Sequence, residues 1–116
     1  MLPKKNRLTK KEFTRVFQKG RTFASGDFVV KYGSYQRRSV RFAFSVGLKI
    51  SKRATVRNAL RRQLYQCVGG LVSPQSTTPA GDYVVVLRPQ EKPVTAKKLP
   101  SSSCALLLEA IRKVGR

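Results

Sequence analysis

The first apolar pattern along the chain has the spacing of an α-helix. Its members recur at intervals of three and four positions: Phe13, Val16 and Phe17. This spacing predicts an amphipathic helix over about residues 10–19, with basic residues on the opposite side. Thr9 and Glu12 are spaced as a capping box, which marks the beginning of the helix, and Gly20 favours its end.

Two further helices are predicted in the second half of the chain. The longer covers about residues 54–71, and its apolar side consists of Val56, Leu60, Leu64, Cys67, Val68 and Leu71. The last begins at an N-cap within residues 101–103, and its apolar side consists of Cys104, Leu107, Leu108, Ile111 and Val114. Between them lies a loop over residues 88–100, rich in Pro and Lys, for which the pattern predicts no regular structure.

Alternation of apolar and polar residues predicts antiparallel strands between the first two helices. The alternating apolar residues are Phe28, Val30 and Tyr32 in one run and Val40, Phe42, Phe44 and Val46 in the next. A short strand is expected near residues 22–24, and the unbroken apolar run 83–87 is typical of a strand buried on both faces. The order α-β-β-β-α-β-α predicts an α+β sandwich, as a single domain over residues 1–116.

The charge of the chain narrows the choice of partners. Lys and Arg number 25 against 5 Asp and Glu, so the formal net charge is +20, and no acidic residue occurs from Phe28 to Gly81. Because like charges on a small fold repel one another, such a surface is expected to meet a polyanion, most directly a nucleic acid. No apolar run reaches about 20 residues, so neither a membrane span nor a membrane partner is expected.

The inventory of reactive side chains excludes several kinds of active site. The sequence contains no His and its carboxylates are dispersed, which excludes a His general base and disfavours a magnesium site built by the protein alone. Cys67 and Cys104 match no zinc spacing and lie among apolar residues, so we expect two reduced, buried thiols in a cytoplasmic protein. No catalytic residue and no protein-bound metal are predicted.

The strongest candidate site is the basic run that leads into the second helix and continues along it. The residues expected to bind RNA are Lys49, Lys52, Arg53, Arg57, Asn58, Arg61 and Arg62. Arg grips phosphate with a planar fork of donors, and the helix N-terminus adds further N–H groups. A merely solvated basic face is the alternative, but no acid stands at i, i+4 spacing to pair with these cations, which favours binding.

A second candidate site consists of aromatic residues near the first helix. Phe13 and Phe17 lie one turn apart, and the following strand carries Lys31 and Tyr32. Exposed aromatic rings beside cations can stack on unpaired bases. Phe at helical spacing is more often part of a core, and the pattern by itself leaves both interpretations open.

The basic run also carries a family resemblance. A signature of the bacterial ribonuclease P protein subunit reads approximately Val-x-Lys-Lys, a spacer, then Arg-Asn-Arg-x-Lys-Arg. This chain resembles it at Ser45–Lys49 and then at Arg57–Arg62. Further segments match the family in the order in which the family has them: Asn6-Arg7-Leu8, residues 13–20, residues 82–86 and Arg88-Pro89. Two positions depart from it, because Ala59 and Leu48 stand where the family usually offers the RNA a cation.

The resemblance implies a fold, an activity and a set of partners. Members of this family have an α-β sandwich with a left-handed βαβ crossover, an exception to the right-handed rule. They bind a catalytic RNA, and the assembled ribonucleoprotein removes the 5′ leader of precursor tRNA with Mg²⁺ held mainly by the RNA. The protein is thus an accessory subunit of an endoribonuclease, with no obligate protein partner. The residues that match the leader-binding cleft are Phe13, Phe17, Lys31 and Tyr32.

Two other functions fit the composition. A non-catalytic RNA-binding module, such as a ribosomal protein, would associate with its RNA without changing leader cleavage. A DNA-binding architectural protein would show no preference for the 2′-hydroxyl of RNA.

Overall fold

A four-stranded sheet forms the centre of the computed structural model, which describes residues 4–25, 28–35, 39–72, 78–88 and 103–114. The strands are β1 (Arg21–Ser25), β2 (Phe28–Gly33), β3 (Val40–Ser45) and β4 (Gly81–Leu87), in the spatial order β1-β2-β4-β3. β2 pairs antiparallel with both β1 and β4. The expectation of antiparallel pairing is wrong for β3, because β4 lies between β2 and β3 and pairs with β3 in parallel. The short strand near residues 22–24 and the strand at 83–87 are confirmed.

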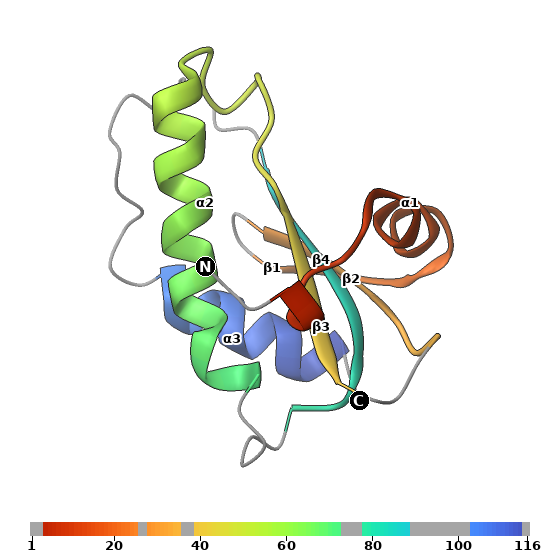
Figure 1. The fold of residues 1–116 in the computed structure, drawn as a ribbon. Helices are drawn as coiled ribbons and strands as arrows, with labels where there is room; N and C mark the ends of the chain where they lie inside the picture. The colour runs from red at the N-terminus through yellow and green to blue at the C-terminus, as the bar shows by residue number, and fades with distance from the viewer. Residues whose placement is uncertain (1–3, 26–27, 36–38, 73–77, 89–102, 115–116) are drawn as a thin grey trace.

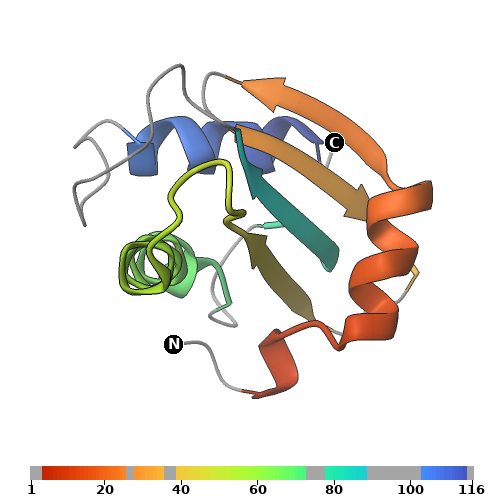
Figure 2. The same ribbon diagram turned by 90° about the horizontal axis from the view of Figure 1, so that it is seen from above.

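Helices cover both faces of this sheet. They are α1 (Lys10–Lys19), α2 (Ala54–Val68) and α3 (Ser103–Val114), with short 3-10 turns at Lys4–Asn6 and Gly69–Val72. Figure 1 shows α2 and α3 on one side of the sheet and α1 on the other, and Figure 2 shows the same layers from above. The predicted α+β sandwich and its order of elements are confirmed, and α1 occupies the predicted residues 10–19.

The main core lies between the sheet and the pair α2 and α3. Tyr83 is fully buried at its centre, with ring centroids 4.8 Å from Tyr32 and 5.1 Å from Phe42. The alternating residues of the strands meet the apolar sides of α2 and α3 there, as the pattern predicts. Full burial of such large apolar side chains stabilises the fold by about 1.5–3 kcal/mol each. This core holds the outward flank of α2 in a fixed orientation.

The connection from β3 through α2 to β4 has an unusual hand. The two strands are adjacent and parallel. α2 connects them along the chain and packs on one face of the sheet. Seen from the α2 side with both strands pointing up, β4 lies to the left of β3 (Figures 1 and 2). The crossover is therefore left-handed, as the family resemblance implies and against the usual rule.

Glycines determine the ends of α1 and α2. α1 ends at Gly20 as predicted, but this residue has an ordinary φ of −73°. Glycine is needed because a Cβ there would lie 2.6 Å from the Val16 carbonyl oxygen and 2.8 Å from that of Tyr32. The second helix ends at Val68 rather than residue 71, and the chain continues as a 3-10 turn. Gly69 and Gly70 explain this change, because glycine disfavours α-helix. The predicted N-cap at 101–103 and the 88–100 loop lie largely outside the described residues.

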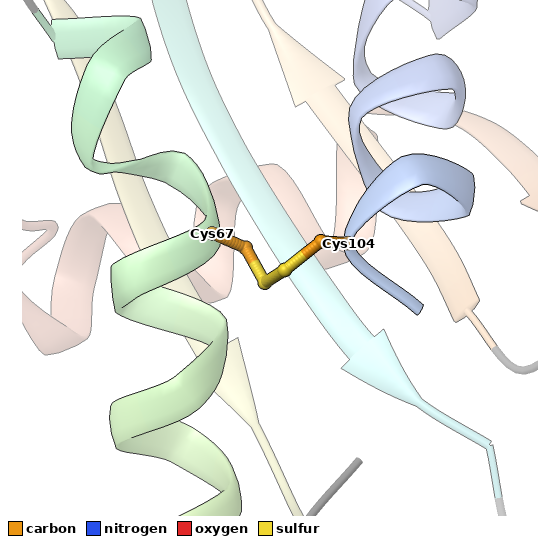
Figure 3. The surroundings of a disulfide bond; sticks show 2 residues. All are labelled: Cys67 and Cys104. Atoms are coloured by element: carbon orange, nitrogen blue, oxygen red, sulfur yellow. A yellow bond between two sulfur atoms is a disulfide. The ribbon is translucent and has the colours of Figure 1, made fainter. Parts of the chain in front are cut away.

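The two cysteines form a disulfide, so the expectation of two reduced, buried thiols is wrong (Figure 3). Their Cα atoms are 5.4 Å apart although 37 residues separate them in sequence. Cys104 is exposed and Cys67 is half-buried. The pairing arises because the last turn of α2 and the first turn of α3 meet on the same face of the sheet, which no spacing rule could show.

Candidate nucleic-acid interface

The basic run occupies the N-terminal half of α2 and the loop before it. Ile50 and Ser51 are buried and anchor this loop, and the Ser51 hydroxyl accepts a hydrogen bond of 3.2 Å from the backbone N–H of Arg53. α2 then begins after Arg53, and its apolar side turns into the core. The opposite flank faces outward and carries the cations. We call the full set the basic surface: Lys49, Lys52, Arg53, Arg57, Asn58, Arg61 and Arg62.

Intramolecular contacts divide the basic surface into two kinds of residue. Arg57 is half-buried and donates a hydrogen bond of 2.9 Å to the Ser51 carbonyl, while Arg61 donates one of 2.9 Å to the Asn58 side-chain oxygen. These contacts orient both guanidinium groups, each of which has five N–H donors and keeps several for a phosphate. The remaining cations, Lys49, Lys52, Arg53 and Arg62, are exposed.

No carboxylate among the described residues neutralises this surface. The described acids are Glu12, Asp82 and Glu109, which lie on α1, β4 and α3, and they pair with Arg15, Arg41 and Lys113. The positive potential over α2 is therefore uncompensated within the described part of the chain, which is the electrostatic footprint expected of a phosphate-binding face.

The N-terminal segment adds a further cation, Arg7, which belongs to the Asn6-Arg7-Leu8 stretch that resembles the family. Arg7 forms a parallel β-bridge with Phe42, and the next N–H, of Leu8, donates to the Phe42 carbonyl at 3.1 Å. Burial raises the pKa of the Tyr65 hydroxyl, and the positive charges of Arg7 and Arg61 act in the opposite direction. The positive charges of Arg7 and Arg61 thus both act on Tyr65 of α2.

The two Phe residues of α1 lie at the surface rather than in the core. Their rings are stacked, with centroids 5.7 Å apart, and Phe17 is 44% exposed. Val16 supplies the fully buried contact of α1 instead. The ammonium of Lys31 on β2 lies 4.9 Å from the centroid of the Phe17 ring. The structure therefore brings together Phe13, Phe17 and Lys31, which we call the aromatic–lysine cluster.

Tyr32 does not join this cluster. Neighbouring residues of a strand point to opposite faces, so Tyr32 points away from Lys31 and into the core under α2 and α3. It is 6% exposed, and its hydroxyl donates a hydrogen bond of 2.7 Å to the Ala80 carbonyl. In this structure Tyr32 is a packing residue, and it is not available as the leader contact that the resemblance implies.

An ion cluster that the sequence pattern did not suggest lies under α1. Asp82 on β4 is fully buried and accepts two hydrogen bonds, of 2.9 and 3.0 Å, from Arg41 on β3. Arg41 also pairs with Glu12 in the first turn of α1, and Arg15 lies 3.9 Å from Asp82. Only the parallel register, which sets Arg41 opposite Asp82, could reveal this arrangement, because the two residues are far apart in sequence.

The charges of the ion cluster stabilise one another. The hydrogen bond to Asp82 raises the pKa of the Arg41 guanidinium, against the effect of partial burial. Partial burial opposes ionisation of Glu12, but hydrogen bonds from Thr9 and the charge of Arg41 hold its pKa below the ordinary value. Glu12 thus contributes stability at pH values above its unfolded pKa, and the contribution is lost as the pH falls through the folded pKa.

The described residues offer no metal centre of the usual kind. Within the ranges given above, no three His, Cys, Asp or Glu side chains come together in a way that could hold a metal ion. None of the helices in that part of the chain has the length and apolar character needed to cross a membrane.

Comparison with known proteins finds matches to a single family. The family model described as Ribonuclease P matches residues 2–111. The ribonuclease P protein component of Geobacillus kaustophilus is 32% identical over 98% of this chain and 90% of its own length. That of a Synechocystis strain is 35% identical over 77% of this chain and 72% of its own length.

Solved structures share the fold. One structure of the Staphylococcus aureus RNase P protein is 24% identical and covers 96% of this chain and 98% of its own, with a TM-score of 0.72. Another, 26% identical, covers 99% of this chain and 92% of its own, with a TM-score of 0.67. The family model extends over nearly the whole chain and the curated relatives match it along most of their length, so the chain belongs to the family of ribonuclease P protein components.

Proposed function

We propose that this chain binds the catalytic RNA of ribonuclease P through its basic surface and holds the 5′ leader of precursor tRNA at its aromatic–lysine cluster. The observation that carries the proposal is the separation of the two surfaces. α2 and α1 lie on opposite faces of the sheet, so two RNA segments can be bound at once (Figures 1 and 2). A chain of net charge +20 placed between two polyanions reduces their mutual repulsion.

The aromatic–lysine cluster suits a single-stranded leader. An exposed Phe ring can stack on an unpaired base of any identity, and base–aromatic stacking is worth about 1–3 kcal/mol per base. The Lys31 ammonium beside the Phe17 ring can meet the adjoining phosphate. This combination binds many leader sequences, as a general tRNA-processing enzyme requires.

In this proposal the protein positions RNA and does not cut it. The sequence contains no His to act as a general base. Mg²⁺, held mainly by the RNA subunit, would supply the charge stabilisation and the activated water for phosphodiester hydrolysis. The protein contributes binding and orientation, through Arg and Lys on one face and stacked aromatic rings on the other.

A reconstitution assay tests the proposal. Leader cleavage is measured with the cognate RNA subunit alone, with the protein alone and with both, over a series of Mg²⁺ concentrations. We expect no cleavage by the protein alone and a lower Mg²⁺ requirement for the pair than for the RNA alone. If the protein leaves leader cleavage by the RNA unchanged at every concentration, it is an RNA-binding module of another kind, such as a ribosomal protein.

Replacing Phe17 by alanine tests the leader site. We expect the holoenzyme to lose about fivefold of its preference for leader-bearing over mature tRNA, since one partly exposed stacking contact is removed. Equilibrium binding of both substrates provides the measurement. Leu106→Ala is the matched control, because Leu106 on α3 is 37% exposed, against 44% for Phe17, and lies on the other face of the sheet. Equal substrate preference in the two variants would show that Phe17 does not contact the leader.

A further inference from the structure

The ion cluster lies between α1 and the sheet, beside the residues proposed to bind the leader. Arg41 donates to both oxygens of the buried Asp82 and also pairs with Glu12, so one guanidinium joins β3, β4 and α1. Asp82 is 0% exposed, and a carboxylate at that depth requires the guanidinium opposite it. Arg41 is therefore held rigidly by the sheet, and it presents a fixed charge to the first turn of α1.

Other contacts also tie α1 to the sheet. Val16 is its buried apolar contact, and Gly20 fixes its C-terminal end by close approach to Tyr32. The other end is held by Glu12, whose carboxylate also accepts a hydrogen bond of 2.9 Å from the Thr9 backbone N–H. Arg15, one turn further along, lies 3.9 Å from Asp82. The N-terminal half of α1 is thus tied to the sheet by these charged contacts, in addition to the half-buried Phe13 and the hydrogen bond from Leu8 to Phe42 just before the helix.

The orientation of α1 determines where Phe17 lies. Phe13 and Phe17 are four residues apart and therefore share one side of α1. A small rotation of α1 about its axis moves this side relative to β2. We propose that Arg41, acting through Glu12, is a positioning residue that sets α1 so that the Phe17 ring lies beneath the Lys31 ammonium, and that it thereby sets the affinity for the leader. The leader part of this inference rests on the proposed function.

Glu12→Gln is the sharpest test. Gln at this position still completes the capping box, so α1 keeps its helical start while the charge that faces Arg41 is removed. Glu109→Gln is the matched control, because it removes the same charge from an ion pair on α3, with Lys113 at 2.9 Å, that does not involve α1. Both variants raise the net charge equally, so any general gain in RNA affinity is the same in each.

Two measurements separate the positioning from the function. In the free protein, nuclear Overhauser contacts between the Phe17 ring and the Lys31 side chain should weaken in Glu12→Gln and persist in Glu109→Gln. In the holoenzyme, Glu12→Gln should lose about fivefold of the preference for leader-bearing over mature tRNA, the ratio that corresponds to one partly exposed ion pair. Affinity for the RNA subunit should match that of Glu109→Gln, because the basic surface is untouched.

Each outcome decides one part of the inference. Unchanged Phe17–Lys31 contacts in Glu12→Gln would overturn the positioning role. Weakened contacts with an unchanged leader preference would limit Arg41 to the local structure and overturn its effect on the leader. If the wild-type holoenzyme shows no leader preference at all, the proposed leader site is wrong, while the contacts in the free protein still decide whether Arg41 positions α1.

Discussion

Replacing Arg53 and Arg62 by alanine is expected to weaken binding to the catalytic RNA on the order of 30-fold near 0.1 M salt, and to reduce the salt slope by about 1.5. Both side chains are exposed on the basic surface. Removing them would delete two of the proposed phosphate contacts without disturbing the fold. Arg57 and Arg61 are less suitable, because their hydrogen bonds to Ser51 and Asn58 would be lost at the same time. Titration of labelled RNA over a series of KCl concentrations measures both quantities.

The control for this variant is Arg112→Ala with Lys113→Ala. It removes the same number of charges from the last turn of α3, where Lys113 lies over the Phe23 ring of β1, at the sheet edge opposite to β3. Its salt slope should stay close to that of the wild type. If the two double variants lose affinity and slope equally, the RNA responds to net charge alone and the basic surface is not the binding site.

Replacing both cysteines by serine is expected to lower the free energy of unfolding by about 3–4 kcal/mol, as estimated for a disulfide that closes a loop of this size. The two residues are 37 positions apart, and the bond joins the end of α2 to the start of α3. The bond stabilises chiefly by restricting the unfolded chain. Urea unfolding of the oxidised protein and of the Cys67→Ser, Cys104→Ser variant measures the difference.

The same measurement in the presence of a reductant provides the control. Reduced wild-type protein should unfold close to the double variant, because both lack the cross-link. A wild-type protein that unfolds at the same urea concentration with and without reductant, and whose two thiols react with an alkylating agent in the absence of reductant, would contradict the disulfide.

Local patterns predict the elements of this fold well because they report what each segment must bury. The capping box Thr9–Glu12 and the apolar set around Val16 place α1 over its observed residues. The alternation from Phe28 to Tyr32 and from Val40 to Phe44 predicts which strand residues meet the core. The same reasoning predicts the outward flank of α2.

Local sequence patterns do not show contacts between segments that are far apart in the chain. Cys67 and Cys104 each have an apolar helical setting, which predicts buried thiols, and only the meeting of α2 with α3 pairs them. Tyr32 stands next to Lys31 in sequence, yet the pleat of β2 sends the two side chains to opposite faces. The pairing of Arg41 with Asp82 follows from the parallel register of β3 and β4.

For this protein the sequence alone indicates three things. Periodicity indicates the secondary structure, net charge indicates a polyanionic partner, and the spacing of the motif indicates the family. All three are properties of the chain itself and do not depend on how it packs. Tertiary structure decides that Phe17 of α1 is exposed and that Glu12 of α1 pairs with Arg41, which also binds the buried Asp82. It also decides that α2, with the basic surface, and α1, with the two Phe residues, lie on opposite sides of the sheet. The physical reason is that exposure, pairing and sidedness depend on which distant segments pack together, and the packing of a common core selects those neighbours.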